Sequence, residues 1–162
     1  MPNILPTSNI KLETELKLNE IIKLINDNTE LSESLGMKIT NKQFIGKTYE
    51  KGFKIISSKF PTGVFSVLEG NINKKNNKSE IEINVTIQKA FVVLFCLWLL
   101  LPIFGIVNSV LKIGLIKTIP LILVLLIMLY LLKKIVIVKL FRKTTESGME
   151  NLKQLLNANE ME

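Results

Sequence analysis

The sequence predicts an α+β membrane protein, in which a small antiparallel sheet precedes a two-helix transmembrane hairpin and a C-terminal amphipathic helix. Residues 1–89 contain several short stretches in which polar and apolar side chains alternate, as they do in half-buried strands. Residues 90–141 contain no Asp or Glu and hold two long apolar runs, which favours a membrane segment over a soluble core. We therefore expect three parts: a cytoplasmic α+β domain (1–89), the hairpin (90–134), and a basic juxtamembrane segment with a C-terminal helix that docks on the domain (135–162).

The first part is predicted to have the element order β-α-β-β-β-β, with the single helix covering one face of the sheet. The helix is expected over residues 20–28 with Asn19 as its cap, followed by a further helical turn over residues 29–35 that ends at Gly36. Strands are expected over residues 10–18, 43–50, 53–59, 64–72 and 81–87, with turns at 51–52 and 61–63 and a solvated loop at 73–78.

The second part is predicted to cross the membrane twice, over about residues 90–111 and 113–132. Six basic residues flank the outer ends of the two runs, whereas only Lys112 and Lys117 lie near the connection, so both termini are expected inside the cell. Residues expected to anchor the protein at the interface are Lys89, Tyr130, Lys133, Lys134, Lys139, Arg142 and Lys143.

The third part is predicted to end in an amphipathic helix. Ser147 and Glu150 have capping-box spacing, which predicts that this helix starts at Ser147. Its apolar stripe would comprise Met149, Leu152, Leu155 and Leu156. A stripe of this kind needs a partner surface, and we expect the sheet to provide it.

Three short segments followed by the apolar runs carry a resemblance. They are Phe44-Ile45-Gly46-Lys47, Gly52-Phe53-Lys54-Ile55 and Val67-Leu68-Glu69-Gly70-Asn71-Ile72. Together with the apolar runs, this region of about residues 40–140 resembles uncharacterised small bacterial membrane proteins with an N-terminal β-rich cytoplasmic domain and a two-helix membrane hairpin. The resemblance implies an architecture and no catalytic residues.

The composition argues against most catalytic chemistry. The chain has no histidine, and Asp27 and Cys96 are the only residues of their kinds, so we expect no catalytic, cofactor-binding or metal site. Gly46-Lys47-Thr48 matches only the end of a phosphate-binding loop, since Asn41 stands where the first glycine belongs. Glu80 and Glu82 are interpreted as a solubilising face, and Glu69 as the first carboxylate to mutate.

These observations favour a membrane-tethered cytoplasmic binding or scaffold module, an accessory subunit of a bacterial membrane complex, and not an enzyme. The expected partners are anionic lipid headgroups and another protein, while nucleic acid is excluded because the chain has a single Arg and no aromatic platform. The lysine-rich composition favours a low-GC bacterium. Three alternatives stay open: an immunity or protective protein against a membrane-acting toxin, an interfacial enzyme that uses Glu and Lys, and an ion-conducting oligomer.

Overall fold

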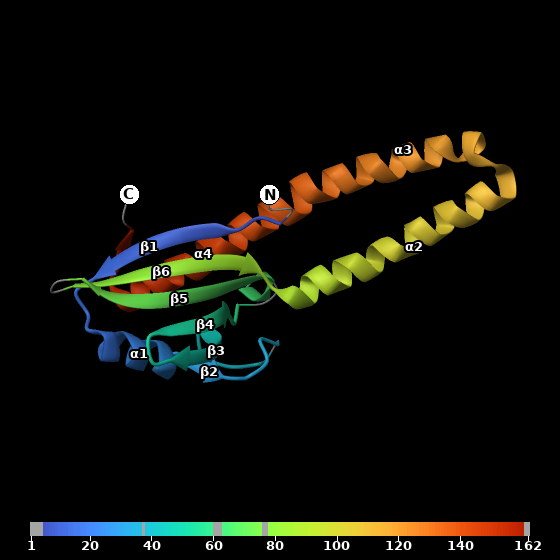
Figure 1. The fold of residues 1–162 in the computed structure, drawn as a ribbon. Helices are drawn as coiled ribbons and strands as arrows, with labels where there is room; N and C mark the ends of the chain where they lie inside the picture. The colour runs from blue at the N-terminus through green and yellow to red at the C-terminus, as the bar shows by residue number, and fades with distance from the viewer. Residues whose placement is uncertain (1–4, 37, 60–62, 76–77, 161–162) are drawn as a thin grey trace. The chain divides into compact units, whose positions relative to one another are not determined.

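The chain divides into two compact units, seen here in a computed structural model that describes residues 5–36, 38–59, 63–75 and 78–160. The α/β unit comprises residues 1–88 and 141–162, and the apolar unit comprises residues 89–140. Figure 1 shows the elements of both units: β1 (Ser8–Thr14), α1 (Leu18–Asp27), β2 (Thr29–Leu31), β3 (Phe44–Tyr49), β4 (Gly52–Ser57), η1 (Gly63–Phe65), β5 (Ser66–Lys75), β6 (Lys78–Ile87), α2 (Lys89–Ile113), α3 (Leu115–Leu131), the π-helical η2 (Leu132–Ile137), α4 (Val138–Leu156) and β7 (Asn159–Glu160).

The α/β unit is built on a mixed seven-stranded sheet with strand order β2-β3-β4-β5-β6-β1-β7. Four consecutive strands, β3 to β6, form an antiparallel meander, and β1 pairs with β6 along its whole length. Only β2 runs parallel to its neighbour, β3. The regular alternation of Ile81, Ile83, Val85 and Ile87 in β6 places these four side chains in the core.

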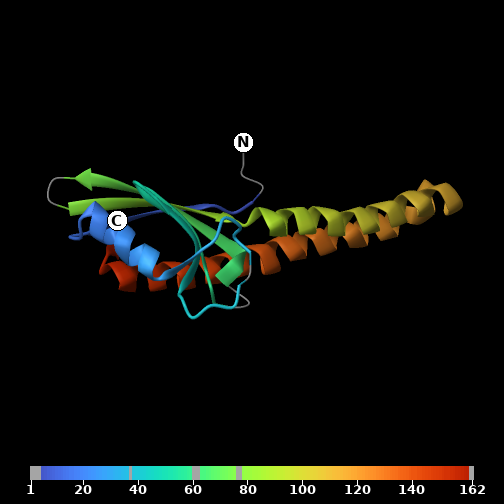
Figure 2. The same cartoon turned by 90° about the horizontal axis from the view of Figure 1, so that it is seen from below.

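Two helices cover the same face of the sheet. On this inner face Gly46, Ile55 and Leu68 are cross-strand neighbours. Helix α4 reaches this row, because a Cβ built on Gly148 would lie only 3.1 Å from the Leu68 Cδ1 atom. Helix α1 reaches it too, since the Thr48 hydroxyl, two residues along from Gly46, donates to the side-chain Oδ1 of Asn26 in α1 (3.4 Å). The sheet and the two helices thus form two layers around one core (Figure 2).

The predicted fold class is wrong in its sheet. The prediction was a small antiparallel sheet with one covering helix, whereas the structure has seven strands, one of them in parallel pairing, and two covering helices. Residues 29–31 were predicted as a helical turn but form β2. Helix α1 ends at Asn28, and the Ser32 amide then donates to the Gly46 carbonyl (2.8 Å), so pairing with β3 replaces another helical turn.

The predicted two-helix transmembrane hairpin is also wrong. Among the described residues, α2 is the one helix long and apolar enough to cross a membrane. Regular α-helix in the second apolar run stops at Leu131, where the π-helical η2 begins, so α3 has 17 residues. At 1.5 Å per residue this is about 26 Å, short of a hydrocarbon core of about 30 Å.

The C-terminal helix differs from its prediction in where it starts. Ser147 lies in the middle of α4, which begins at Val138 directly after η2, so the capping-box spacing marks no helix start. The predicted apolar stripe does face the core: Met149, Leu152 and Leu156 are buried, and Leu155 is half-buried. The predicted loop over residues 73–78 is wrong where the structure describes it, because residues 73–75 belong to β5 and Lys78 to β6, and residues 64 and 65 of a predicted strand belong to the 3-10 helix η1. The other segment predictions differ at their boundaries. Residues 60–62, which include residues 61 and 62 of the predicted turn, and residues 76–77 of the predicted loop lie outside the described residues.

Candidate functional site

Helix α2 exposes a nearly continuous apolar surface. It has 25 residues and a mean hydropathy of 2.8 over its most apolar window, and no part of that window is buried. Leu101 and Phe104 are each 73% exposed. A helix that is hydrophobic all round is normally buried in protein or in lipid. The described part of the chain does not bury this helix, so by length and composition it is a candidate to cross a membrane.

The Ser109 and Thr118 hydroxyls in the apolar unit bond to backbone carbonyls four residues earlier. The Ser109 hydroxyl donates to the Gly105 carbonyl (2.9 Å) in α2, and the Thr118 hydroxyl donates to the Gly114 carbonyl (2.9 Å) at the start of α3. Such bonds remove the cost of placing a hydroxyl in hydrocarbon. These two hydroxyls are therefore compatible with a hydrocarbon environment.

The predicted anchoring residues lie at both ends of the apolar unit and on α4. Lys89 is the first residue of α2 and is exposed, and the Lys134 ammonium in η2 lies 5.9 Å from the ring centre of Tyr130 in α3. Lys139, Arg142 and Lys143 are exposed on α4, and the Arg142 Nε donates to the Glu146 carboxylate (2.8 Å). Lys133 belongs to η2, but its side chain lies outside the described residues. These placements are compatible with contact to headgroups and leave the anchoring role a prediction.

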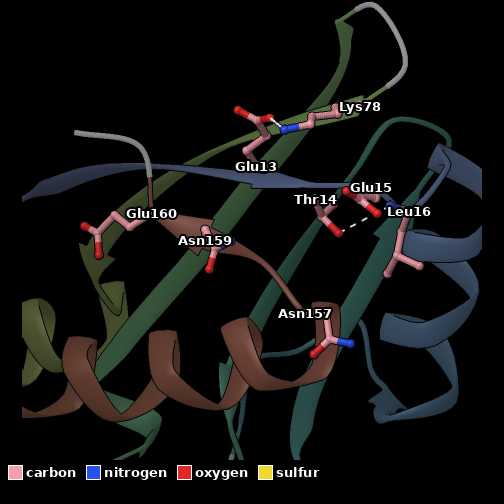
Figure 3. A pocket seen from close by; sticks show the side chains of 8 residues that line it. All are labelled: Glu13, Thr14, Glu15, Leu16, Lys78, Asn157, Asn159 and Glu160. Atoms are coloured by element: carbon pink, nitrogen blue, oxygen red, sulfur yellow. Dashed lines mark hydrogen bonds and ion pairs between the residues drawn. The ribbon is translucent and has the colours of Figure 1, made fainter.

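A polar hollow of about 420 Å³ lies at the end of β1 (Figure 3). Three segments far apart in the sequence line it: Glu13, Thr14, Glu15 and Leu16; Lys78; and Asn157, Asn159 and Glu160. Two hydrogen bonds hold it together, from the Thr14 hydroxyl to the Leu156 carbonyl (2.8 Å) and from the Leu16 amide to the Thr14 hydroxyl (3.3 Å). Asn157 adopts a left-handed conformation (φ 46°), which turns the chain from α4 into β7.

Two of the three carboxylates at the hollow already have cationic partners. Glu13 forms an ion pair with Lys78, and Glu160 forms one with Lys153. The Glu13 carboxylate, through a hydrogen bond and its charge, raises the pKa of Lys78 above its usual value. Among the described residues, no three Asp, Glu, Cys or His side chains are grouped so as to hold a metal ion. Because Glu13 and Glu160 are already paired, we interpret the hollow as a place where ion pairs stabilise the edge of the sheet.

The outer face of the sheet carries the other charged groups that the sequence singled out. Glu69 pairs with Lys54 across neighbouring strands (2.9 Å), as expected for an outward-facing carboxylate. Glu80 receives hydrogen bonds from Lys11 and Lys75, both at 3.3 Å, and these bonds lower the pKa of Glu80 below its ordinary value. Glu82 pairs with the same Lys11 (2.8 Å). The outer face of the sheet thus carries several ion pairs between neighbouring strands.

Gly46-Lys47-Thr48 does not form a phosphate-binding loop. All three residues lie within β3, and the next element is the antiparallel strand β4 instead of a helix. Gly46 has φ +151°, and a Cβ built on it would lie 2.2 Å from the Lys54 carbonyl oxygen. The glycine is therefore required by a close approach of two strands, which agrees with its interpretation as a strand residue.

The sequence contains no signal for the polar hollow, because its three segments meet only when β7 pairs with β1. It did indicate the apolar and basic segments, because composition alone defines them. Comparisons of the chain with protein-family models, curated proteins and solved structures produced no match. Function must therefore be argued from these local features.

Proposed function

We propose that this chain is a membrane-attached binding or scaffold module, an accessory subunit of a complex at the bacterial cytoplasmic membrane. The observation that carries the proposal is α2, a helix of 25 residues whose most apolar window is nowhere buried by the described residues. Burial of apolar surface in lipid stabilises by about 25 cal/mol per Å². A helix of this length therefore provides strong attachment without any other anchor.

The orientation follows from how the two units are connected. Gln88, just before α2, and Phe141, just after the apolar unit, both belong to the α/β unit. The α/β unit as a whole would therefore lie on one side of the membrane. Basic residues at these flanks, including Lys89 and Lys139, favour the cytoplasmic side by the positive-inside rule.

The α/β unit suits binding better than catalysis. Its sheet buries one face under α1 and α4, while the outer face of β1, β5 and β6 is exposed and polar. Opposite charges alternate there in pairs such as Lys11 with Glu82 and Lys54 with Glu69. The carboxylates of Glu69, Glu80 and Glu82 on this face are engaged in ion pairs, and so are Glu13 and Glu160 at the polar hollow. A rigid face of this kind suits contact with a protein partner.

Membrane attachment is tested by extraction of vesicles with alkaline carbonate. We expect the full chain to stay with the lipid, and the triple variant Leu97→Lys, Leu101→Lys, Phe104→Lys to be released or degraded. Each lysine in the middle of a membrane helix costs about 2.5–3.5 kcal/mol. The matched control carries three lysines on the outer face of the sheet, Asn71→Lys, Asn73→Lys and Asn84→Lys, and should behave like the original chain. Release of the unmodified chain by carbonate would refute the proposal.

The binding role is tested by crosslinking in cells and capture in mild detergent, using the full chain. We expect a defined membrane partner whose capture is reduced by charge reversal on the outer face, for example Lys54→Glu. Recovery of the protein alone would count against a scaffold role. If deletion instead sensitised cells to a membrane-acting toxin with no partner captured, the protective role predicted above would replace it.

A further inference from the structure

The connection between β2 and β3, described over residues 32–36 and 38–43, returns to the end of the sheet from which the chain enters α2. It leads into the start of β3, beside the end of β4, since Phe44 is paired with Ser57. The start of β5 and the end of β6 meet at the same end, because Ser66 is paired with Ile87. Helix α2 begins two residues after Ile87. The connection and the root of α2 therefore share one end of the α/β unit.

A direct hydrogen bond ties this connection to the root of α2. The side-chain amide of Gln88, the residue just before α2, donates to the carbonyl oxygen of Leu35. The Gln88 backbone amide donates to the Phe65 carbonyl (3.0 Å), which fixes the same residue to the sheet. Leu35 is thus held beside the point where a membrane-spanning α2 would meet the headgroups.

Two further hydrogen bonds hold the connection after Ile39, at Thr40 and Lys42. The Thr40 hydroxyl donates to the Glu30 carboxylate (3.4 Å), and the Ser58 hydroxyl donates to the Lys42 carbonyl. Between these anchors and Leu35 stand Lys38 and Ile39, both exposed. Ile39 is 109% exposed, the highest value among the exposed large hydrophobic residues described.

Exposed large apolar side chains are few in the α/β unit. Among its described residues they are Leu31 (58%), Ile39 (109%) and Tyr49 (45%). A single exposed apolar residue is ordinary in a soluble protein. Leu31 ends β2 and pairs with Gly46, two residues into β3, so it lies away from the end at which α2 starts. Ile39 belongs to the connection that is bonded to Gln88, and with Lys38 beside it this position matches the pairing of apolar and basic side chains that binds a bilayer surface.

We propose that Lys38 and Ile39 form a second membrane contact, with the Ile39 side chain in the headgroup boundary and Lys38 on anionic phosphates. The proposal rests on the membrane attachment argued above. The connection between β2 and β3 would then attach the α/β unit to the bilayer surface at a second point. The ligand is the anionic bilayer surface itself.

The test places an environment-sensitive fluorophore at single cysteines in the full chain, reconstituted in vesicles of phosphatidylcholine and phosphatidylglycerol. The background is Cys96→Ser, which removes the single native cysteine. Three variants are compared: Ile39→Cys at the proposed contact, Leu101→Cys in α2, and Asn73→Cys as the matched exposed control. Asn73 is paired with Glu80, seven residues before Ile87, so it lies about 23 Å along the strand from the membrane end.

Quenching by lipids with a nitroxide near the headgroup is the measurement. We expect quenching at position 39 to exceed that at position 73 roughly threefold, because an interfacial side chain sits about 5–10 Å into the boundary. The excess should shrink in pure phosphatidylcholine or with Lys38→Gln. If position 101 is quenched by deep nitroxides while position 39 matches position 73, the second contact is refuted and membrane attachment stands. If position 101 is not quenched, attachment itself fails.

Discussion

Gly148 of α4 and Leu68 of β5 approach so closely that a Cβ on the glycine would lie 3.1 Å from the Leu68 Cδ1 atom. Both residues are buried, and Leu68 has no exposed surface. The contact lets α4 lie directly on the sheet. It thereby joins the segment after the apolar unit to the segment before it.

A larger side chain at this contact should weaken the α/β unit. Gly148→Leu should lower the free energy of unfolding by about 2 kcal/mol, because overpacking a full core typically costs about 1–3 kcal/mol and exceeds the gain in helix propensity. Denaturation of the full chain in detergent, followed by far-UV circular dichroism, measures this effect. In a Leu68→Ala background the loss caused by Gly148→Leu should be smaller, since the two sites share one volume.

The matched control is Gly105→Leu in α2, where nothing lies within 4 Å of the added Cβ. It should leave the unfolding of the α/β unit unchanged. Equal losses in the Leu68 and Leu68→Ala backgrounds would mean that the two residues do not share the contact.

Gly70 is a second position where only glycine fits, because the ring of Phe53 occupies the space of a Cβ atom. The ring of Phe53 in β4 lies over Gly70 in β5, and a Cβ on Gly70 would be 2.2 Å from Phe53 Cζ. Phe53 is fully buried and cannot swing away. Gly70→Ala should therefore destabilise by about 1–3 kcal/mol in urea unfolding. Gly36→Ala, whose Cβ would meet only the Ser34 hydroxyl at 3.7 Å, should change stability by less than about 0.5 kcal/mol. A neutral Gly70→Ala variant would show that the ring has room to move.

The hydroxyl of Thr14 closes the C-terminus of α4. It donates to the carbonyl of Leu156, one of the last carbonyls of the helix, and the bond is buried. Thr14→Val keeps the shape but leaves this carbonyl unpaired, so the free energy of unfolding should fall by about 1–3 kcal/mol. Thr86→Val, a half-buried strand position in β6, serves as the control and should change stability by less than about 0.5 kcal/mol. Similar results for the two valine variants would argue that water replaces the lost hydroxyl.

The sequence predicted best those features that depend on local pattern. The strict alternation in β6 and the apolar stripe of α4 are each visible within about ten residues, and both face the core. Helix α1 was also predicted, although it starts after Lys17, whose backbone amide donates to the Glu20 carboxylate (2.9 Å), and Asn19 is not its cap.

Features that depend on distant segments could not be predicted in this way. Residues 29–31 are a strand only because β3 lies beside them, so short-range propensity gave a helical turn instead. The end of α3 is set by the change to π-helix at Leu132, which apolar composition does not reveal. The polar hollow and the ion pair of Lys11 with Glu80 join residues more than 60 positions apart. None of these contacts can be inferred from composition or local pattern.

Ion pairs on the outer face should make stability depend on pH at the acidic end. Hydrogen bonds from Lys11 and Lys75 lower the pKa of Glu80 in the folded chain, whereas the unfolded residue titrates near 4.5. The stabilisation by Glu80 is therefore fully present above the unfolded pKa, and is lost as the pH falls from about 4.5 through the lower folded pKa. Glu80→Gln should reduce the urea midpoint at pH 7, and the difference from the original chain should vanish in acid.

The partner lysines provide the matched background for this measurement. In a chain carrying Lys11→Gln and Lys75→Gln, Glu80→Gln should have little further effect on the urea midpoint at any pH, because the ammonium groups that favour its ionised form are gone. At the alkaline end the same logic reverses. Glu82 and Glu80 raise the pKa of Lys11 above 10.5, so the contribution of Lys11 is complete below that pH and is lost as the pH rises through the raised folded pKa. A difference between Glu80→Gln and the original chain that persisted unchanged at pH 3 would show that Glu80 stabilises the sheet through its packing and not through its charge.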